Sequence, residues 1–385
     1  MRPSVALLDS AGVAPLPERS GTPDDVARRY VACVGAAGPQ HYVDNASVDM
    51  KALVVDGTVL PVTINRGGNA SAAVCSPFAH YVRYTIEELA KRHPRVPPRV
   101  FGTLMRPLAM LLDRGRIDRI VCVNNWLFST NPSLTLSASQ IDAVTACLTR
   151  AFPDSAIAFR SINPVADAPL MDALRANGYR FVRSRRVYMV DAARHRHLEH
   201  KDGRIDLRLL QRTPYEVVRD HERLAAHVSR LTTLYRDLYL TKHSRLNPWF
   251  NERFIALTLR ERILSYVGLQ RNGSLDGFIA YFVRGGVMTG VLLGYDQRLP
   301  RKLGLYRLVF AQHMADAAAQ RLQLNLSAGS DRFKVLRGGL PVEEVDAVYS
   351  RHLPARQCLT WVALELATRL WTRLRGAAFD LRAGS

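Results

Sequence analysis

The sequence predicts an α/β (α+β) protein made of two units, and three observations lead to this fold class. Short apolar runs typical of strands alternate with helical segments along the 385 residues, as expected for layers of sheet and helix. Asp56-Gly57 and Asn272-Gly273 each lie between apolar runs, and such dipeptides are the strongest local signal of a tight hairpin. A polar, charged stretch at 192–203 separates two apolar-rich halves.

The first half is expected to alternate strands and helices. Gly178 is placed to end one helix, because glycine readily adopts the left-handed conformation that closes helices. The expected elements are a strand over 51–64 broken by the hairpin turn, an apolar stretch near 71–75, helices over 81–91 and 102–113, a strand over 119–123, a helix over 139–152, a strand over 156–160, a helix over 169–176 and a strand over 180–190.

The second half repeats this rhythm. Asn251 is a good residue to begin a helix, because its side chain can accept a hydrogen bond from the first turn. The expected elements are a strand over 206–210, a kinked helix over 214–241, a helix to 259, strands over 264–271, 278–284 and 287–293, a helix over 305–321, a strand over 324–327, a helix-like segment over 331–336, a short ambiguous segment over 342–349 and a last helix over 360–375.

The turn between the strand at 287–293 and the helix at 305–321 is the most informative segment. It contains Arg301, Lys302 and Gly304 immediately before the helix. The first N–H groups of a helix have no intrahelical partner, and the helix dipole favours negative charge there. Arginine and lysine would add charge-assisted hydrogen bonds to a phosphate. The segment therefore predicts an anion site.

Four segments of the sequence, one of which contains this turn, resemble a known family. They are LYLTKHSRLNPWFNERF from Leu238, GYDQRLPRKLGLYR from Gly294, LNLSAGSDRFKVLRGG from Leu324 and VYSRHLP from Val348. The series resembles the GNAT acyltransferases that share the FemAB-like double fold, in which each domain has a mixed, mostly antiparallel sheet flanked by helices. The family's pyrophosphate turn reads roughly Arg/Gln-x-x-Gly-x-Gly/Ala, and Tyr306 stands here at the last, small position.

The resemblance covers about residues 205–355 and extends more weakly over 45–190, on the phrase LMDALRANGYRFVRSRRVYMVD. No matching turn occurs in the first half. The expected organisation is a partly disordered lead-in over 1–44, a GNAT-like domain without cofactor over 45–192, a linker over 193–203, a catalytic GNAT domain over 204–356, and a basic amphipathic helix and tail over 357–385.

The resemblance implies an N-acyltransferase that uses acyl-CoA as a co-substrate, or an acyl carrier protein, with no permanently bound cofactor or metal. A small amine is the expected acceptor. The backbone before the turn would hold the thioester carbonyl, and the turn would hold the pyrophosphate. The residues expected to contact the donor are Val291, Leu292, Leu293, Arg301, Lys302, Leu303, Gly304, Leu305 and Tyr306.

Acyl transfer to an amine also needs a group that accepts the amine proton. His243 is one candidate, because a neutral imidazole can accept a proton near pH 7. Asp296, directly after the apolar strand, is the other. The alternative interpretations are a histidine at a helix end and an aspartate that caps a loop. The residues expected to contact the substrate are Tyr281, Ser327 and Lys334.

The formal net charge of +19 raises the question whether the chain binds nucleic acid. The excess is mostly arginine spread along the chain, without a zinc pattern or a long basic block, so tRNA is expected only under an alternative, a FemAB-like aminoacyl transferase that uses charged tRNA. Tyr306 motivates a third interpretation, a non-catalytic GNAT fold that binds a ligand or partner. Five scattered cysteines favour a reducing, cytoplasmic setting.

The tail offers one further interpretation. Trp361, Leu364, Thr368, Trp371 and Leu374 follow helical spacing, and Arg369, Arg373 and Arg375 add positive charge. Such a helix either packs on the core or lies on an anionic membrane surface. The second reading would place the protein peripherally on the inner membrane.

Overall fold

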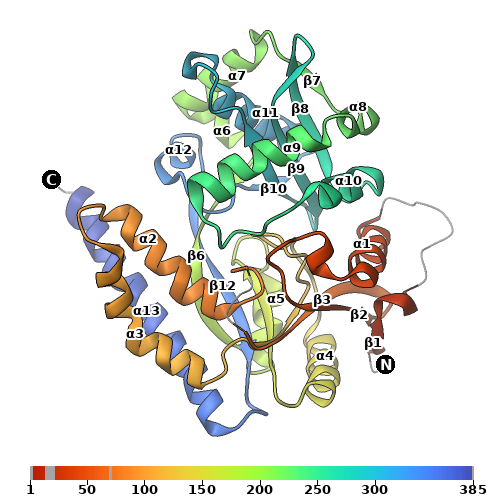
Figure 1. Cartoon of the computed structure of the whole chain (residues 1–385), viewed down its shortest axis with the longest axis vertical. Helices are drawn as coiled ribbons and strands as arrows, with labels where there is room; N and C mark the ends of the chain where they lie inside the picture. Colours follow the sequence, from red (N-terminus) through yellow and green to blue (C-terminus); the bar gives the residue numbers. More distant parts are fainter. Residues whose placement is uncertain (1–2, 14–21, 69–71, 384–385) are drawn as a thin grey trace.

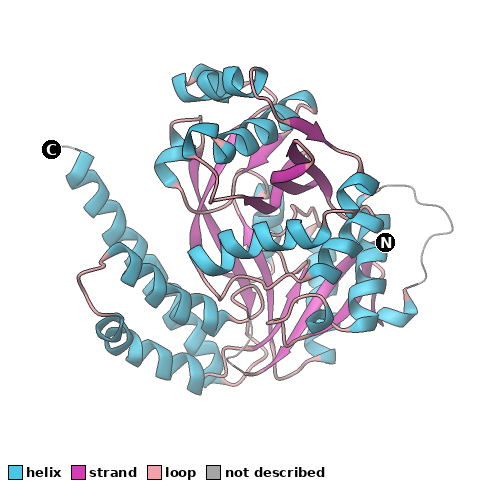
Figure 2. Ribbon diagram, turned by 45° about the horizontal axis from the view of Figure 1, so that its top comes forward, coloured by secondary structure: helices cyan, strands magenta, loops and turns pink. Residues whose placement is uncertain are grey.

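A computed structural model of the chain describes residues 3–13, 22–68 and 72–383, with side chains of the last helix described as far as Thr372. Within these residues the strands form one 12-stranded sheet that runs through the whole molecule, with helices packed on it (Figures 1 and 2). The strand order is β1-β2-β3-β4-β5-β12-β6-β11-β10-β9-β8-β7. The mixed α/β fold class predicted from the sequence is confirmed.

The first half supplies strands one to six of this sheet. Its α4 helix starts with a capping box, in which the Ser137 hydroxyl accepts from the Gln140 N–H and the Gln140 side chain accepts from the Ser137 N–H. The elements are β1 (Val5–Asp9), η1 (Ser10–Gly12), α1 (Pro23–Ala37), η2 (Pro39–His41), β2 (Asp49–Val55), β3 (Thr58–Arg66), η3 (Ala79–Tyr84), α2 (Thr85–Arg92), α3 (Pro98–Arg114), β4 (Arg119–Val123), α4 (Ala138–Ala151), β5 (Ala156–Ile162), α5 (Ala168–Ala176) and β6 (Arg180–Asp191).

The second half supplies strands seven to twelve. Asn251 caps α10 as expected, accepting from the Phe254 N–H. The elements are α6 (Arg196–Glu199), α7 (Lys201–Gln211), β7 (Glu216–Val218), α8 (His221–Ala225), α9 (Val228–Arg236), η4 (Asp237–His243), α10 (Glu252–Arg260), β8 (Ser265–Arg271), β9 (Ser274–Arg284), β10 (Val287–Tyr295), η5 (Arg301–Leu303), α11 (Leu305–Ala319), β11 (Gln323–Asn325), α12 (Asp331–Val335), β12 (Leu340–Tyr349) and α13 (Ala355–Ala383).

The two halves repeat one strand pattern and exchange their last strands. Each half has antiparallel pairs followed by one parallel pair, β4 with β5 and β10 with β11. Strand β12 of the second half then lies between β5 and β6 of the first, and β6 pairs with β11. The halves are joined through the sheet, because each lends its final strand to the junction.

Irregular pairing occurs where the halves meet. Between β6 and β12 the register shifts so that Ser184 is an extra residue, and between β5 and β12 the shift leaves Ser161 in a left-handed conformation with φ 62°. Bulges of this kind bend a strand, re-aim side chains and recur beside active sites. The junction is therefore a structurally special part of the sheet.

Helices on both faces bury the core. On one face of the second half, α9 and α10 pack through Leu234, Tyr235 and Phe254, and on the other α11 packs through Leu308 and Val309. Helix α13 crosses β6 and buries Trp361 and Leu364. The described part of the last helix therefore uses one face for core packing.

Several sequence expectations are wrong in detail. Of the lead-in at 1–44, residues 14–21 lie outside the described part, but β1 pairs along β2 and α1 buries Tyr30 fully. The strand expected over 206–210 lies in α7. The expected linker is mostly helical, and Gly203 packs so closely that an added Cβ would lie 1.9 Å from the His197 carbonyl oxygen. The long helix over 214–241 is divided into β7, α8, α9 and η4.

Candidate active site

The parallel strands β10 and β11 diverge soon after they meet. They pair only over Val287–Thr289 and Gln323–Asn325, while β10 continues to Tyr295. On its other edge β10 pairs with β9, and the register shift between Gly290 and Leu292 makes Val291 a bulge. The β11-facing edge from Gly290 onward thus has no strand partner among the described residues. The corresponding strand β4 of the first half pairs with β5 along Ile120–Val123, so the opening belongs to the second half.

The basic turn follows this opening as expected. Gly304 has φ 67°, a left-handed conformation natural to glycine, and starts α11. The first intrahelical bond runs from the Leu308 N–H to the Gly304 carbonyl at 2.9 Å, so three earlier amides precede it. Arg301 and Lys302 are exposed, and their side chains make no hydrogen bond or ion pair with the described residues. Free amides and free cations are therefore grouped at this helix start.

Tyr306 occupies the position where the family turn has a small residue. Its ring lies 5.6 Å from Tyr295, 4.7 Å from Phe310 and 4.7 Å from Phe333. Burial raises the pKa of its hydroxyl. The large residue packs into an aromatic cluster that joins α11 to α12, so its size has a structural explanation. From the neighbouring α7, the side chain of Leu209 approaches Gly304.

His243 lies at the end of η4, beside a cavity of about 470 Å³. Partial desolvation, then Lys242 and Lys91, lowers the pKa of its imidazole. The neighbouring Lys242 reaches Tyr295 at the end of β10, with Nζ 3.5 Å from the hydroxyl. A neutral imidazole thus lies close to the mouth of the strand opening. The cavity is lined by Glu87, Arg236, Leu240, Thr241, His243, Ser244, Arg245 and Trp249.

Asp296 has a different environment from His243. Its carboxylate accepts hydrogen bonds from Arg298, at 3.0 and 2.8 Å, and from Arg230 at 2.7 Å. These partners, Arg298 first, hold the pKa of Asp296 well below its ordinary value. A carboxylate engaged by two arginines is a poor proton acceptor. Its contacts instead tie the strand end to α9.

Ser327 and Lys334 are brought together by the chain between β11 and α12. Lys334 is 2% exposed, and its ammonium donates to the carbonyls of Ser327 at 3.0 Å and Ala328 at 2.7 Å. Burial lowers the pKa of Lys334 to about 7. The Ser327 hydroxyl is 2.9 Å from that of Thr130 in the first half. This pair therefore lies at the junction of the halves.

Tyr281, which was expected to contact the substrate, lies on a different face of the sheet from α9 and α10. Tyr281 packs on the α11 face of the sheet, 5.4 Å from His313, whereas Phe282, next in the strand, belongs to the α9 and α10 face. Tyr281 is 5% exposed. Its side chain lies on the face of β9 that packs against α11, whereas α9, which leads into η4, packs on the other face.

A buried ion pair at the junction was not foreseen from the sequence. Arg185 of β6 donates from Nε to Glu344 of β12 at 2.7 Å and from Nη2 to the Thr130 hydroxyl at 2.7 Å. Glu344 is 1% exposed, its Oε2 has no partner in the described residues, and burial raises its pKa. The sequence does contain a signal for this pairing, because the basic run RSRR and the acidic run EEVD each lie inside an otherwise apolar strand.

The π-helical segments η3 and η4 come from opposite halves of the chain, and π-helical turns recur at functional sites. His80 of η3 lies 2.8 Å from the Ser184 hydroxyl, and burial lowers its pKa to about 4. Tyr81 donates to Asp346 at 2.8 Å, and the Ser161 N–H donates to the other oxygen. The bulged strands are thus held by polar contacts to η3.

The described residues hold no cluster of three or more histidine, cysteine or acidic side chains arranged for a metal ion. No helix among them is both long and apolar enough to span a bilayer.

No protein-family model and no curated protein sequence matches the chain. Among solved structures, the C-terminal DUF2156 domain of a protein assigned as a lysylphosphatidylglycerol synthetase from Agrobacterium fabrum is 13% identical, with a TM-score of 0.48 over 88% of this chain and 91% of that chain. FemX is 9% identical, with a TM-score of 0.43 over 59% and 79%. A tandem GNAT protein from the clavulanic acid biosynthesis pathway is 11% identical, with a TM-score of 0.38 over 90% and 98%.

The chain has a FemAB-like tandem GNAT fold. This fold is seen in the topology of the sheet. Two units of six strands each contain one parallel pair at the same place, and they exchange their last strands. The similarities to solved structures, at these identities and TM-scores, say nothing about the activity of this chain.

Proposed function

We propose that the chain is an acyltransferase that moves an acyl group from the thioester of acyl-CoA, or of an acyl carrier protein, to an amine. The observation that carries this proposal is the divergence of β10 and β11 with a bulge at Val291. An open strand edge offers backbone N–H groups to an extended donor and to its carbonyl oxygen. Arg301, Lys302 and the first amides of α11 would hold the donor's phosphates.

The chemistry follows from these groups. The amine nitrogen attacks the thioester carbonyl carbon, the C–N bond forms, and the C–S bond breaks as the carbonyl re-forms. The thiolate leaves and takes up a proton. Neutral His243 accepts the proton lost by the amine, a role that its lowered pKa permits at neutral pH. We assign this role to His243 rather than Asp296, whose carboxylate is engaged by Arg298 and Arg230.

Lys334 is proposed to contact the acceptor or the reacting carbonyl from the junction side. Its ammonium already donates to the carbonyls of Ser327 and Ala328. With a pKa of about 7, it can change protonation state during turnover at neutral pH. The neutral form would be a second proton acceptor at the junction of the halves.

A second candidate is an aminoacyl transferase with a charged tRNA as donor. Two observations favour it, the net charge of +19 and the Tyr306 ring at the position where the CoA turn has a small residue. Structures with this type of fold include FemX and a lysylphosphatidylglycerol synthetase domain. The remaining candidate is a ligand-binding protein without catalytic activity, and it too is motivated by Tyr306 at the position of a small residue. For each of the three we propose a cytoplasmic location, which the five cysteines without a disulfide support.

Thermal shift separates the donors, because a ligand that binds the folded state raises the melting temperature by mass action. We expect acetyl-CoA or a long-chain acyl-CoA to raise the melting temperature, and pantetheine, which lacks the pyrophosphate, to raise it less. If charged tRNA raises the melting temperature and acyl-CoA does not, the second candidate replaces the thioester proposal. Stabilisation by acyl-CoA without acyl transfer to any of a panel of amines would favour the ligand-binding protein.

A further inference from the structure

Helices α3 and α13 lie side by side on one outer side of the molecule, away from the β10 opening (Figures 1 and 2). Gly115, just after α3, allows this approach, because a Cβ there would lie 2.2 Å from the Thr360 hydroxyl. Pro107 lies inside α3 and cannot donate to the carbonyl one turn before it. The close contact at one end and the irregular helix leave a groove between the two helices.

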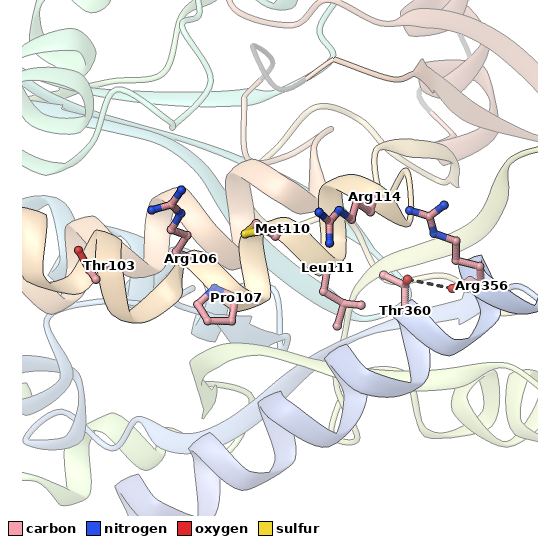
Figure 3. A pocket seen from close by; sticks show the side chains of 8 residues that line it. All are labelled: Thr103, Arg106, Pro107, Met110, Leu111, Arg114, Arg356 and Thr360. Carbon is pink, nitrogen blue, oxygen red and sulfur yellow. Dashed lines mark hydrogen bonds between the residues drawn. The ribbon is translucent and has the colours of Figure 1, made fainter.

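The groove has a volume of about 600 Å³ and is lined by basic and apolar side chains (Figure 3). Arg106, Arg114 and Arg356 are exposed, and none forms an ion pair with the described residues. No carboxylate lines the groove; Asp113, the acidic residue of α3, is exposed outside it. The lining residues are Thr103, Arg106, Pro107, Met110, Leu111, Arg114, Arg356 and Thr360.

Large apolar side chains surround this groove. On α13, Leu359 is 64%, Leu366 58% and Leu370 59% exposed, and their spacing of seven and four residues places them on one stripe. This stripe lies opposite Trp361 and Leu364, which face the core. Trp371 is also exposed but lies on the Leu364 side of the helix, and α3 adds the exposed Val100, Leu104, Met110 and Leu111. An exposed apolar area of this kind marks an interaction site.

We propose that the α3–α13 side docks on the surface of a bilayer that contains anionic phospholipids. The exposed leucines would enter the acyl region, while the three groove arginines contact phosphate groups. Charge complementarity selects this occupant, because three unpaired guanidinium groups among apolar side chains match an anionic headgroup layer above acyl chains. Beyond Thr372 the sequence adds three arginines and one aspartate, which continues the positive charge.

Co-sedimentation with vesicles tests the proposal on the full chain. Vesicles of phosphatidylcholine and phosphatidylglycerol in equal parts should bind the protein, and phosphatidylcholine vesicles should bind it at least about tenfold less. The triple variant Arg106→Gln, Arg114→Gln, Arg356→Gln should weaken binding roughly tenfold to a hundredfold. The pair Leu366→Ser, Leu370→Ser should weaken it about tenfold. Added salt should weaken binding by the wild type more than by the triple variant.

The matched control is the triple variant Arg150→Gln, Arg212→Gln, Arg253→Gln, which removes the same charge from exposed residues of other elements. Circular dichroism and melting temperature show that each variant is folded. Equal loss of binding in the control, or equal binding to both vesicle types, would overturn the assignment. A third result would also overturn it: the protein binds no vesicles but forms dimers in light scattering, and the leucine variant abolishes these dimers. The occupant would then be a second copy of the chain.

Discussion

Arg185 of β6 and Glu344 of β12 form an ion pair across the strands that the two halves exchange, with Nε 2.7 Å from Oε1. The carboxylate is buried, and its second oxygen has no partner among the described residues. The same guanidinium reaches Thr130, whose hydroxyl meets Ser327 near Lys334. The pair therefore connects the sheet junction to the site proposed for acyl transfer.

The first prediction concerns this pair. Arg185→Ala should lower the free energy of unfolding by about 3 kcal/mol, because it leaves a buried carboxylate without its cation. Changing both residues, Arg185→Met with Glu344→Leu, should lower it less than Arg185→Ala alone, since no buried charge remains. Urea unfolding measures both. A double variant that loses more than the single one would show that the pair is a net source of stability.

A second prediction follows from the lowered pKa of Lys334. The folded protein releases this proton at a lower pH than the unfolded chain, so unfolding takes up a proton between about pH 7 and the ordinary lysine range. The contribution of Lys334 to stability therefore rises with pH. The difference in unfolding free energy between wild type and Lys334→Met should grow by roughly 2 kcal/mol from pH 7 to 9. Lys201→Met, at an exposed lysine, should show no such growth.

The third prediction concerns His243 as proton acceptor. His243→Gln should lower the turnover rate by about 10²–10⁴ without changing donor affinity. In the wild type the rate should fall as the pH drops through the lowered pKa of His243, because the protonated ring cannot accept a proton. Lys91→Met removes one cation that lowers this pKa, so the acid limb should move to higher pH. An unmoved limb in that variant, or full activity of His243→Gln, would remove His243 from the mechanism.

A fourth prediction separates packing from binding at Tyr306. Tyr306→Ala should lower the free energy of unfolding by about 3–5 kcal/mol, since it empties the space between Tyr295, Phe310 and Phe333. Tyr306→Phe keeps the ring and should lose only about 1 kcal/mol. It should also keep its donor affinity. A large loss of affinity in Tyr306→Phe would instead give the hydroxyl a direct role in binding.

Local signals explain what the sequence could predict. Strand β4 was expected at its observed bounds, and the β8–β9 hairpin follows from Asn272-Gly273, because both depend on neighbouring residues. The basic turn was likewise visible, since glycine and two cations precede an apolar helix. Features of this kind require no knowledge of distant contacts.

Distant contacts explain the rest. Residues 206–210 were expected as a strand, but Asp206 in α7 is buried against Arg307 and Arg337, which lie 101 and 131 residues further along the chain. The place of β12 between β5 and β6 depends on pairing with strands about 150 to 190 residues earlier, where Glu344 lies opposite Arg185. The junction network was missed because each member is ordinary alone. Its chemistry arises only when the two halves meet.

The central claim is that a CoA donor binds at the β10 opening and the start of α11, and calorimetric titration with acetyl-CoA tests it most directly. The double variant Arg301→Ala, Lys302→Ala should weaken binding by roughly 2–4 kcal/mol, because two charged hydrogen-bonding partners are lost. The control Arg212→Ala, Lys201→Ala removes equal charge elsewhere and should bind as the wild type does. Unchanged affinity in the folded Arg301 and Lys302 variant would contradict the account.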